Sequence, residues 1–335
     1  MSDKKRSFRG AILGGMLSIA LFAIAGFLLF NQQYVKDQII VWGYSPTSVV
    51  KSIEERIDLT TKGEFHFYAT QPVVDGAEKF NQDCPRQETT SPILGCYTSD
   101  HRIYIYDITD VRLDGIEEVT AAHEMLHAVW ARMSSSEQAR IGALLRAEYQ
   151  KHMTDANLVE RMEYYQRTEP GQFENELHSI LGTEERDVGS ELNDYYAQYF
   201  NDRQKVVDLH DKYDTVFEDI RLKSNTLYDE LKSLGENIEA RTTQYNADVQ
   251  QLSSDIDTFN NRANSGDFSS INEFNRERAA LVVRSNQIDD MRASISADID
   301  VYNEKYKDYQ LLISQLEVLN KSIDSIKDLQ PTPSV

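Results

Sequence analysis

The chain has 335 residues, of which 40% are hydrophobic, 27% charged and 10% aromatic, as is typical of a folded globular protein. This length allows one or two domains with hydrophobic cores. The formal net charge is −20, which argues against a nucleic-acid-binding protein, because such a protein needs a basic face to displace phosphate counterions. We therefore expect no nucleic-acid partner.

An apolar run near the N-terminus predicts a membrane anchor. Residues 11–30 carry no charge and, at about 1.5 Å per residue, would span a hydrocarbon core of about 30 Å as a helix. Basic residues precede this run and do not follow it directly, namely Lys4, Lys5, Arg6 and Arg9. The positive-inside rule then places residues 1–10 in the cytoplasm and the bulk of the chain outside it. A cleaved signal peptide is the alternative, which we disfavour because the apolar run continues past Ala25 to Phe30.

The segment that follows the anchor predicts three short elements. Ser45-Pro46-Thr47 is typical of a helix start and predicts a helix over residues 49–57. Residues 64–69 alternate and are rich in aromatic side chains, so we predict a strand there. Residues 72–80 predict a short helix.

The chain has two cysteines, Cys84 and Cys96, and both lie in the part that we expect outside the cytoplasm. A cysteine pair in an oxidising compartment predicts a disulfide, which for a loop this short is worth about 3 kcal/mol. Unbridged thiols or metal ligands are the alternatives, although a zinc site made of thiolates would need further cysteines.

A second strand and a series of helices are predicted next. Residues 102–107 alternate again and predict the strand, and Asp114-Gly115 predicts a turn. The helices are predicted over residues 116–133, 134–152, 156–167 and 170–181. Ser134 and Glu137 form a capping box at the start of the second helix, and Gly182 is suited to end the last one as its C′ residue.

The helix predicted over residues 116–133 contains the sequence His123-Glu124-Met125-Leu126-His127. Histidines four residues apart lie on one face of a helix, so both imidazoles can bind a single Zn²⁺ ion at about 2.0–2.1 Å. Glu124 follows the first histidine and can accept a proton from an attacking water. The helix is otherwise apolar almost all round, which predicts burial, and buried polar side chains need a partner such as a metal. Two satisfied core histidines, or a relic site, are the alternative.

A third metal ligand must come from farther along the chain. Residues 128–133 do not continue the motif as HxxGxxH, which excludes the metzincin pattern. A glutamate on a later helix is the other common source, and Glu176 fits this position. Glu174 and His178 are rival ligands.

With these two motifs, the chain resembles the gluzincin metallopeptidases over roughly residues 64–200. Their second motif often reads Asn-Glu-x-x-Ser-Asp, and Asn175-Glu176-x-x-Ser179 matches it up to the last position, which is Ile180 here. The resemblance implies that Glu176 binds zinc. It also implies that another acid, Glu174 or Asp194, replaces the missing carboxylate that orients a ligand histidine.

The resemblance implies two further roles. In zincins, the strand before the HExxH helix is an edge strand that binds the substrate backbone, and residues 102–107 would hold that place here. Gluzincins also use a downstream histidine or tyrosine to stabilise the oxyanion, for which Tyr195 and Tyr196 are candidates.

From about Glu191, the sequence loses proline and almost all glycine, and apolar residues recur at every seventh position. These stripes, which include Leu231 and Tyr302, predict helices that pack as a left-handed coiled coil. The break at residues 264–267, followed by Ser269-Ser270 as an N-cap, predicts an antiparallel hairpin with arms on the order of 80 Å long.

The sequence therefore predicts a mostly helical α+β protein with five parts. They are a cytoplasmic tail (1–10), a transmembrane helix (11–30), a small zincin-like metallopeptidase domain (31–190), an antiparallel helical hairpin (191–328) and a disordered tail (329–335). The predicted function is zinc-dependent hydrolysis of extracytoplasmic peptides or proteins, with one Zn²⁺ held by His123, His127 and Glu176 and with Glu124 as the catalytic base. The alternative is an envelope scaffold, whose hairpin binds a partner helix or spaces the domain from the membrane and whose zinc site is structural. The hairpin is also a candidate for self-association.

Overall fold

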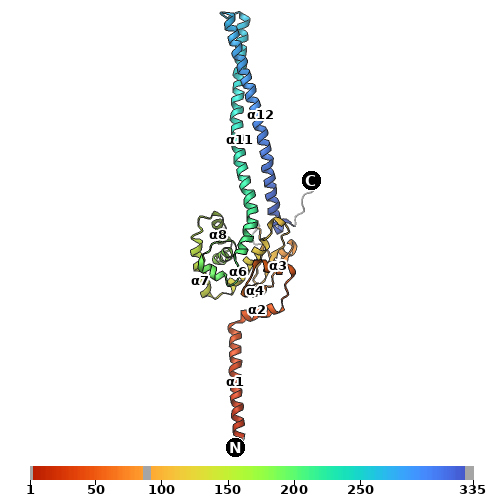
Figure 1. Cartoon of the computed structure of the whole chain (residues 1–335), viewed down its shortest axis with the longest axis vertical. Helices are drawn as coiled ribbons and strands as arrows, with labels where there is room; N and C mark the ends of the chain where they lie inside the picture. Colours follow the sequence, from red (N-terminus) through yellow and green to blue (C-terminus); the bar gives the residue numbers. More distant parts are fainter. Residues whose placement is uncertain (1–2, 86–91, 329–335) are drawn as a thin grey trace. The chain divides into compact units, whose positions relative to one another are not determined.

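The computed structural model describes the backbone of residues 3–85 and 92–328 and the side chains of residues 15–85 and 92–326. The predicted tails, 1–10 and 329–335, therefore lie outside the described side chains. The chain divides into two compact units (Figure 1). The globular unit comprises Met1–Val216 and Leu319–Val335, and the hairpin unit comprises Phe217–Val318. The prediction of a mostly helical α+β protein with two long packed C-terminal helices is confirmed.

The helices described in the globular unit confirm the predicted ranges 49–57, 116–133, 134–152, 156–167 and 170–181 to within about one turn. In chain order they are α1 (Asp3–Phe30), α2 (Gln32–Gly43), α3 (Ser48–Ile57), α4 (Thr61–Tyr68), α5 (Ala77–Asp83), the 3-10 turn η1 (Val111–Leu113), α6 (Ile116–Arg132), α7 (Ser135–Tyr149), α8 (Ala156–Thr168), α9 (Phe173–Thr183), α10 (Gly189–Tyr196), the first turns of α11 (Gln204–Ser265) and α13 (Ser325–Asp328).

The N-terminal helices α1 and α2 meet at a bend of 86°. Among the described side chains, no single helix is long and apolar enough to cross a membrane, but Gly15–Phe30 and Gln32–Gly43 together meet that criterion. By length and composition, this bent pair is compatible with a membrane span and equally with a signal sequence. Residues 11–14 of the predicted span lie outside the described side chains.

The predicted strand over residues 64–69 is wrong, because these residues form most of α4. Thr60 caps this helix by accepting a hydrogen bond from the backbone N–H of Gly63. Gly63 and Phe67, four residues apart, are both buried, so the aromatic segment has a helical core face as well as an alternating pattern. In so short a segment, a helical period and a strand period cannot be distinguished from the sequence. The N-cap at Thr60 favours the helix.

A three-stranded sheet has the order β1-β3-β2, with β1 at Val73–Asp75, β2 at Gly95–Tyr97 and β3 at Ile103–Tyr106. Strand β1 is parallel to β3, whereas β2 is antiparallel to it. The strand predicted over residues 102–107 is confirmed as β3, but the expectation that it is an edge strand is wrong, because it lies at the centre of the sheet. The helix predicted over residues 72–80 is wrong in its first half, which forms β1, and correct in its second half, which begins α5.

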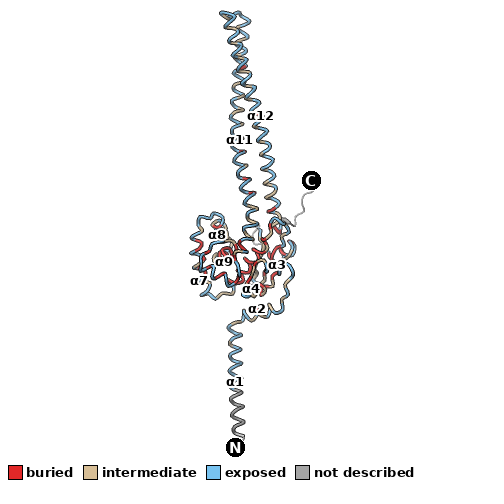
Figure 2. Tube along the Cα trace, viewed as in Figure 1, coloured by how far each residue is buried: buried red, intermediate tan, exposed pale blue. Residues whose placement is uncertain are grey.

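The core of the globular unit is built around α6 and α9, with Ile103 and Ile105 of β3. Figure 2 shows buried residues around α9. Gly182 lies inside α9, so its predicted role as the residue that ends the helix is wrong. A Cβ atom on Gly182 would lie 2.4 Å from Leu126 of α6 and 2.9 Å from Tyr196 of α10. Glycine is therefore needed here because the three helices approach so closely.

The predicted disulfide between Cys84 and Cys96 is confirmed, and it ties the end of α5 to β2. Residues 86–91 of the loop between the two cysteines lie outside the described residues. Helix α5 also contacts α13, where the amide of Asn81 donates to the carbonyl of Ser325 at 3.0 Å and accepts from its hydroxyl at 2.7 Å.

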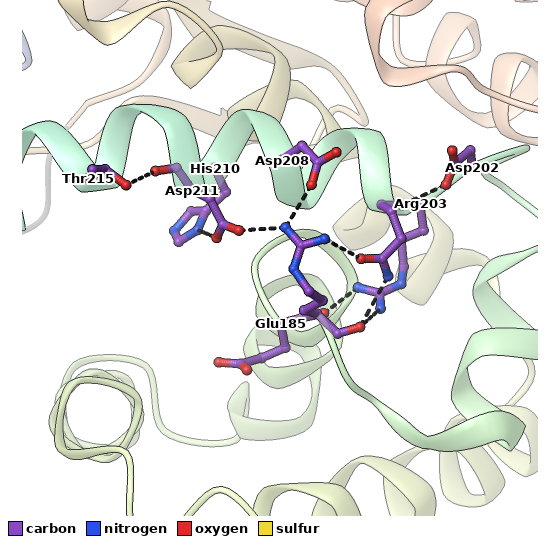
Figure 3. Close-up of polar contacts among 9 residues, drawn as sticks. Glu185, Asp202, Arg203, Asp208, His210, Asp211 and Thr215 are labelled. Atoms are coloured by element: carbon purple, nitrogen blue, oxygen red, sulfur yellow. Dashed lines mark hydrogen bonds and ion pairs between the residues drawn. The ribbon is translucent and has the colours of Figure 1, made fainter.

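The first turns of α11 are fixed within the globular unit by two arginines (Figure 3). Arg186 pairs with Asp208 at 2.7 Å and with Asp211 at 2.6 Å, both on α11. Arg203, just before α11, donates to the backbone carbonyls of Glu185 and Arg186. These contacts hold residues 204–216 in the globular unit.

The hairpin unit consists of the rest of α11 and of α12 (Ile271–Ser322) up to Val318. The stripe residues Leu231, Leu252 and Ile295 are buried, as expected where two helices pack on each other. Gly266, with φ of +77°, forms the turn, and the Ser270 hydroxyl caps α12. The predicted turn and the two packed helices are therefore confirmed.

Candidate metal centre

Helix α6 places two histidines on one side of its axis. It begins after Gly115, which has a φ of +108°, and buries Val119, Ala122 and Leu126 in the core. Because His123 and His127 are one turn apart, their rings lie on the same face, with centroids 4.7 Å apart.

Helix α9 brings a carboxylate to the same place. Glu176 Oε1 lies 3.5 Å from His127 Nε2, and Glu176 Oε2 lies 3.7 Å from His123 Nε2. One ligand atom from each of the three residues lies within 4.8 Å of the others. The structure thus brings the three predicted ligands together in a group that can hold one metal ion.

The donor set of this group fits zinc. Nitrogen and oxygen ligands at about 2.0–2.1 Å in a tetrahedral arrangement are about 3.4 Å apart, and the two N···O distances from Glu176 are 3.5 and 3.7 Å, one to each of its oxygens. Glu176 is only 5% exposed, and although burial favours its neutral form, His127 and His123 bring the pKa of its carboxyl below the usual range. A buried, ionised carboxylate beside two imidazoles requires positive charge, which a metal ion supplies.

A neutral layer orients one of the histidines. His127 Nδ1 lies 3.0 Å from Asn175 Oδ1 and 3.3 Å from the Ser179 hydroxyl. When Nδ1 carries the proton and donates it to Asn175, the lone pair of Nε2 faces Glu176. The expectation that Glu174 or Asp194 orients a ligand histidine is wrong, because Glu174 pairs with Arg146 and Asp194 is exposed.

The rival ligands and the two predicted tyrosines have other partners. Glu174 pairs with Arg146. His178 is fully buried, and its Nε2 lies 2.8 Å from the Tyr195 hydroxyl. Tyr196 donates its hydroxyl to the backbone carbonyl of His178. Burial, reinforced by the nearby His127 and His123, lowers the pKa of His178 to about 3. The candidacy of Tyr195 and Tyr196 as oxyanion donors is therefore wrong, because both hydroxyls are committed to His178 in the core.

Glu124 lies between the metal-binding group and strand β2. The backbone N–H of Tyr97 hydrogen-bonds to its carboxylate, and a Cβ atom on Gly95 would lie 3.0 Å from its Cγ. Burial, opposed by His127 and reinforced by Glu176, raises the pKa of Glu124 to about 7. Glycine at position 95 allows the strand to approach α6 closely enough to cover this carboxyl.

Strand β2 is an edge of the described sheet and packs on α6. It holds the position beside the HExxH helix that sequence analysis gave to residues 102–107. The strand of three residues, with a glycine and a cysteine, has no alternating pattern that would have predicted it.

A tyrosine and a glutamate that interact electrostatically with the metal-binding group were not predicted as site residues. Burial raises the pKa of Tyr165 of α8, the charge of Glu176 adds to this, and Arg161 opposes it. Glu169, just after α8, has a pKa raised by burial and by Glu176, and lowered in part by the two histidines. Only packing of α8 against α9 brings them here, so no local pattern could have identified them.

A charged network adjoins the same group. Glu184 at the end of α9 pairs with Arg161 of α8, and its Oε2 lies 3.3 Å from His210 Nε2 of α11. Burial favours the neutral form of Glu184, but Arg161 and then His210 bring its pKa down to about 2, and His123 contributes in the same direction. The network therefore joins three helices next to the metal-binding histidines.

A search of protein-family models, of curated proteins and of solved structures finds no match to this chain. The function must therefore be argued from the geometry of the metal-binding group and its neighbours.

Proposed function

We propose that the chain is a membrane-anchored, extracytoplasmic zinc peptidase that hydrolyses peptide bonds. The observation that carries this proposal is the arrangement of four side chains: His123, His127 and Glu176 can hold one metal ion, and Glu124 lies buried beside them. The apolar helix α1 and the disulfide between Cys84 and Cys96 support a location outside the cytoplasm.

The residues divide the chemistry between them. When bound, Zn²⁺ supplies a Lewis acid that polarises the peptide carbonyl and activates water near neutral pH. Glu124 accepts the proton of the attacking water and then donates it to the leaving amine. Glu124 is buried beside the three ligands and accepts a hydrogen bond from the backbone N–H of Tyr97, which holds its carboxyl in place to take up and return the proton.

Two neighbours position the substrate and stabilise its charge. The edge of β2 that pairs with no other strand among the described residues would offer backbone groups to an extended peptide, which would then lie across Glu124. The Tyr165 hydroxyl donates a hydrogen bond to the carbonyl oxygen as negative charge develops on it.

The decisive experiment compares metal content and peptide cleavage in the purified full-length chain. Glu124→Gln should keep its zinc and lose about 10²–10⁴-fold in cleavage rate, as expected for a lost general base. His127→Ala should lose both zinc and activity. Glu117→Gln is the matched control, because Glu117 is on the same helix, has a pKa raised by burial to about 7 and accepts a hydrogen bond from Ile108 instead.

The outcomes separate the roles. Cleavage by Glu124→Gln at the wild-type rate would refute the peptidase proposal, and loss of zinc from this variant alone would make Glu124 a ligand. Tyr165→Phe should keep zinc and lower kcat by about 10²–10³-fold, as for the loss of one oxyanion donor. Tyr164→Phe, one residue earlier on α8, is its control. Equal activity of Tyr165→Phe and wild type would remove Tyr165 from the mechanism.

A further inference from the structure

Helix α2 exposes two large apolar side chains although it buries a charged one. Its buried face carries Asp37, which is 2% exposed, whereas its exposed face carries Ile39 and Trp42, which are 60% and 78% exposed. With Val35, these two residues recur at i, i+4 and i+7 and form one stripe along the helix. An apolar stripe that faces outward needs a covering surface, because exposing it to water is unfavourable.

The buried face fixes α2 to the globular unit. Asp37 forms two hydrogen-bonded contacts with Arg132 at the end of α6, at 2.8 and 3.0 Å. Arg132 also donates to the Tyr97 hydroxyl at 3.0 Å. Breaking such a buried pair is costly, so α2 stays packed against the globular unit and its buried charge keeps it out of a hydrocarbon core.

The exposed face continues from an apolar helix. Only Asn31 separates α2 from α1, whose described apolar side chains, such as Phe22 and Phe30, are exposed. The bend of 86° turns α2 almost perpendicular to α1. If α1 enters a bilayer along its normal, α2 must run close to the plane of the bilayer surface, directly where α1 leaves the hydrocarbon.

We propose that the Val35–Ile39–Trp42 face of α2 lies in the lipid–water interface of the membrane that α1 enters; this inference rests on the membrane anchor of the proposed function. Tryptophan favours this interface, and an amphipathic helix lies there with its apolar face about 5–10 Å into the headgroup and acyl boundary. Lys36 is exposed at the border of this face, from where its long side chain reaches the headgroups. The ion pair with Asp37 then holds the end of the metal-binding helix α6 beside the membrane surface.

The test uses the full chain in phosphatidylcholine vesicles whose acyl chains carry bromine, which quenches nearby tryptophan. The chain has two tryptophans, so Trp42 is the sole tryptophan in Trp130→Phe, and Trp130 is the sole tryptophan in Trp42→Phe. We expect Trp42 to lose emission, more with shallow than with deep bromines, and Trp130 to keep its emission. The difference between wild type and Trp42→Phe reports on Trp42 even if Trp130→Phe does not fold.

A second pair of variants tests the stripe itself. Ile39→Asp should reduce the quenching of Trp42, whereas Val111→Asp, at an exposed apolar position away from α2, should not change it. Retention of the chain on the vesicles after an alkaline wash reports separately on the anchor.

The outcomes distinguish the two claims. Unquenched Trp42 in a chain that is retained by the vesicles would overturn the interfacial role of α2 and leave the anchor intact, and would favour a protein as the cover of this face. Equal quenching of both tryptophans would also overturn it. Release of the chain by the wash would refute the anchor, and this inference with it.

Discussion

At the scale of single residues, the metal-binding group is oriented by neutral side chains. Asn175 accepts from His127 at 3.0 Å and in turn donates to Gln172 at 3.0 Å, so an amide chain fixes the imidazole. A carboxylate in this position would raise the basicity of the histidine more strongly than an amide does. Orientation rather than added charge is therefore what Asn175 contributes, since Glu176 already supplies the negative charge of the group.

Replacing Asn175 tests this orientation without any measurement of activity. Asn175→Ala should weaken zinc binding by about 10–100-fold, because His127 loses its principal partner and keeps only the longer contact to Ser179. Competition with a zinc chelator measures the affinity. Asn157→Ala, at an exposed position on α8, is the control and should bind zinc as the wild type does. An unchanged affinity of Asn175→Ala would show that packing alone orients His127.

At the scale of helices, the network of Arg161, Glu184 and His210 joins α8, α9 and α11 beside the metal-binding group. Burial opposes the charges on Glu184 and His210 more than the charge on Arg161, whose side chain is 38% exposed, and mutual attraction offsets that cost while the set is complete. The pKa of His210 is raised by Glu184 despite burial, so the two charges support each other. The network thus ties the start of α11 to the helices that carry the site.

Removing Glu184 should destabilise the globular unit more than removing an exposed carboxylate does. Glu184→Gln leaves Arg161 and His210 without their counter-charge, and because the Arg161 side chain is 38% exposed, water screens part of the loss, so we expect a cost of about 1–3 kcal/mol. Asp208→Asn breaks an exposed ion pair with Arg186 and should cost at most about 1 kcal/mol. Urea unfolding followed by tryptophan fluorescence measures both, since Trp42 and Trp130 lie in the globular unit. Equal effects of the two variants would contradict the importance of burial here.

The same network predicts a dependence of stability on pH. The contribution of Glu184, whose pKa is lowered from 4.5 to about 2, is complete above pH 4.5 and is lost as the pH falls towards 2. The contribution of His210, whose pKa is raised above 6.5, is complete below that value and is lost as the pH rises through the raised pKa. In Glu184→Gln, the stability lost between pH 4.5 and 2 should be smaller than in the wild type.

At the scale of the whole molecule, the chain leaves the globular unit after Val216 and returns to it at Leu319. Peptide hydrolysis does not require the two long helices in between, so the hairpin unit is where the alternative role, the binding of a helical partner or of a second copy, would be located. Within this unit, a Cβ atom on Gly235 would lie 3.5 Å from the ring of Tyr302, one turn from Leu231.

This packing predicts a short distance between Leu231 and Tyr302 within one chain. Spin labels on cysteines introduced at these two positions should report it by electron–electron double resonance. Labels at Leu231 and Leu281 are the control, because Leu281 lies about 30 Å from Tyr302 along α12. Dilution with unlabelled chain should leave the short distance unchanged. A distance that disappears on dilution would mean that the helices pair between chains.

Local physical chemistry determined the elements that depend on near neighbours in the sequence. The histidines of α6, the capping box at Ser134 and the turn near Gly266 follow from spacing and from backbone preferences, so the sequence alone predicts them. The pairing of Cys84 with Cys96 followed from the expected compartment.

The tertiary structure decided what depends on contacts between distant segments. The grouping of Glu176 with the histidines, the partners of Tyr195 and the position of Tyr165 all require the packing of α9 and α8, which no local period encodes. Likewise, whether β3 is an edge strand or a central strand depends on the presence of β2 beside it. Strand β2 is too short to show an alternating pattern in the sequence. The sequence determines which chemical groups are present, whereas the packing of the whole unit determines which of these groups lie next to each other.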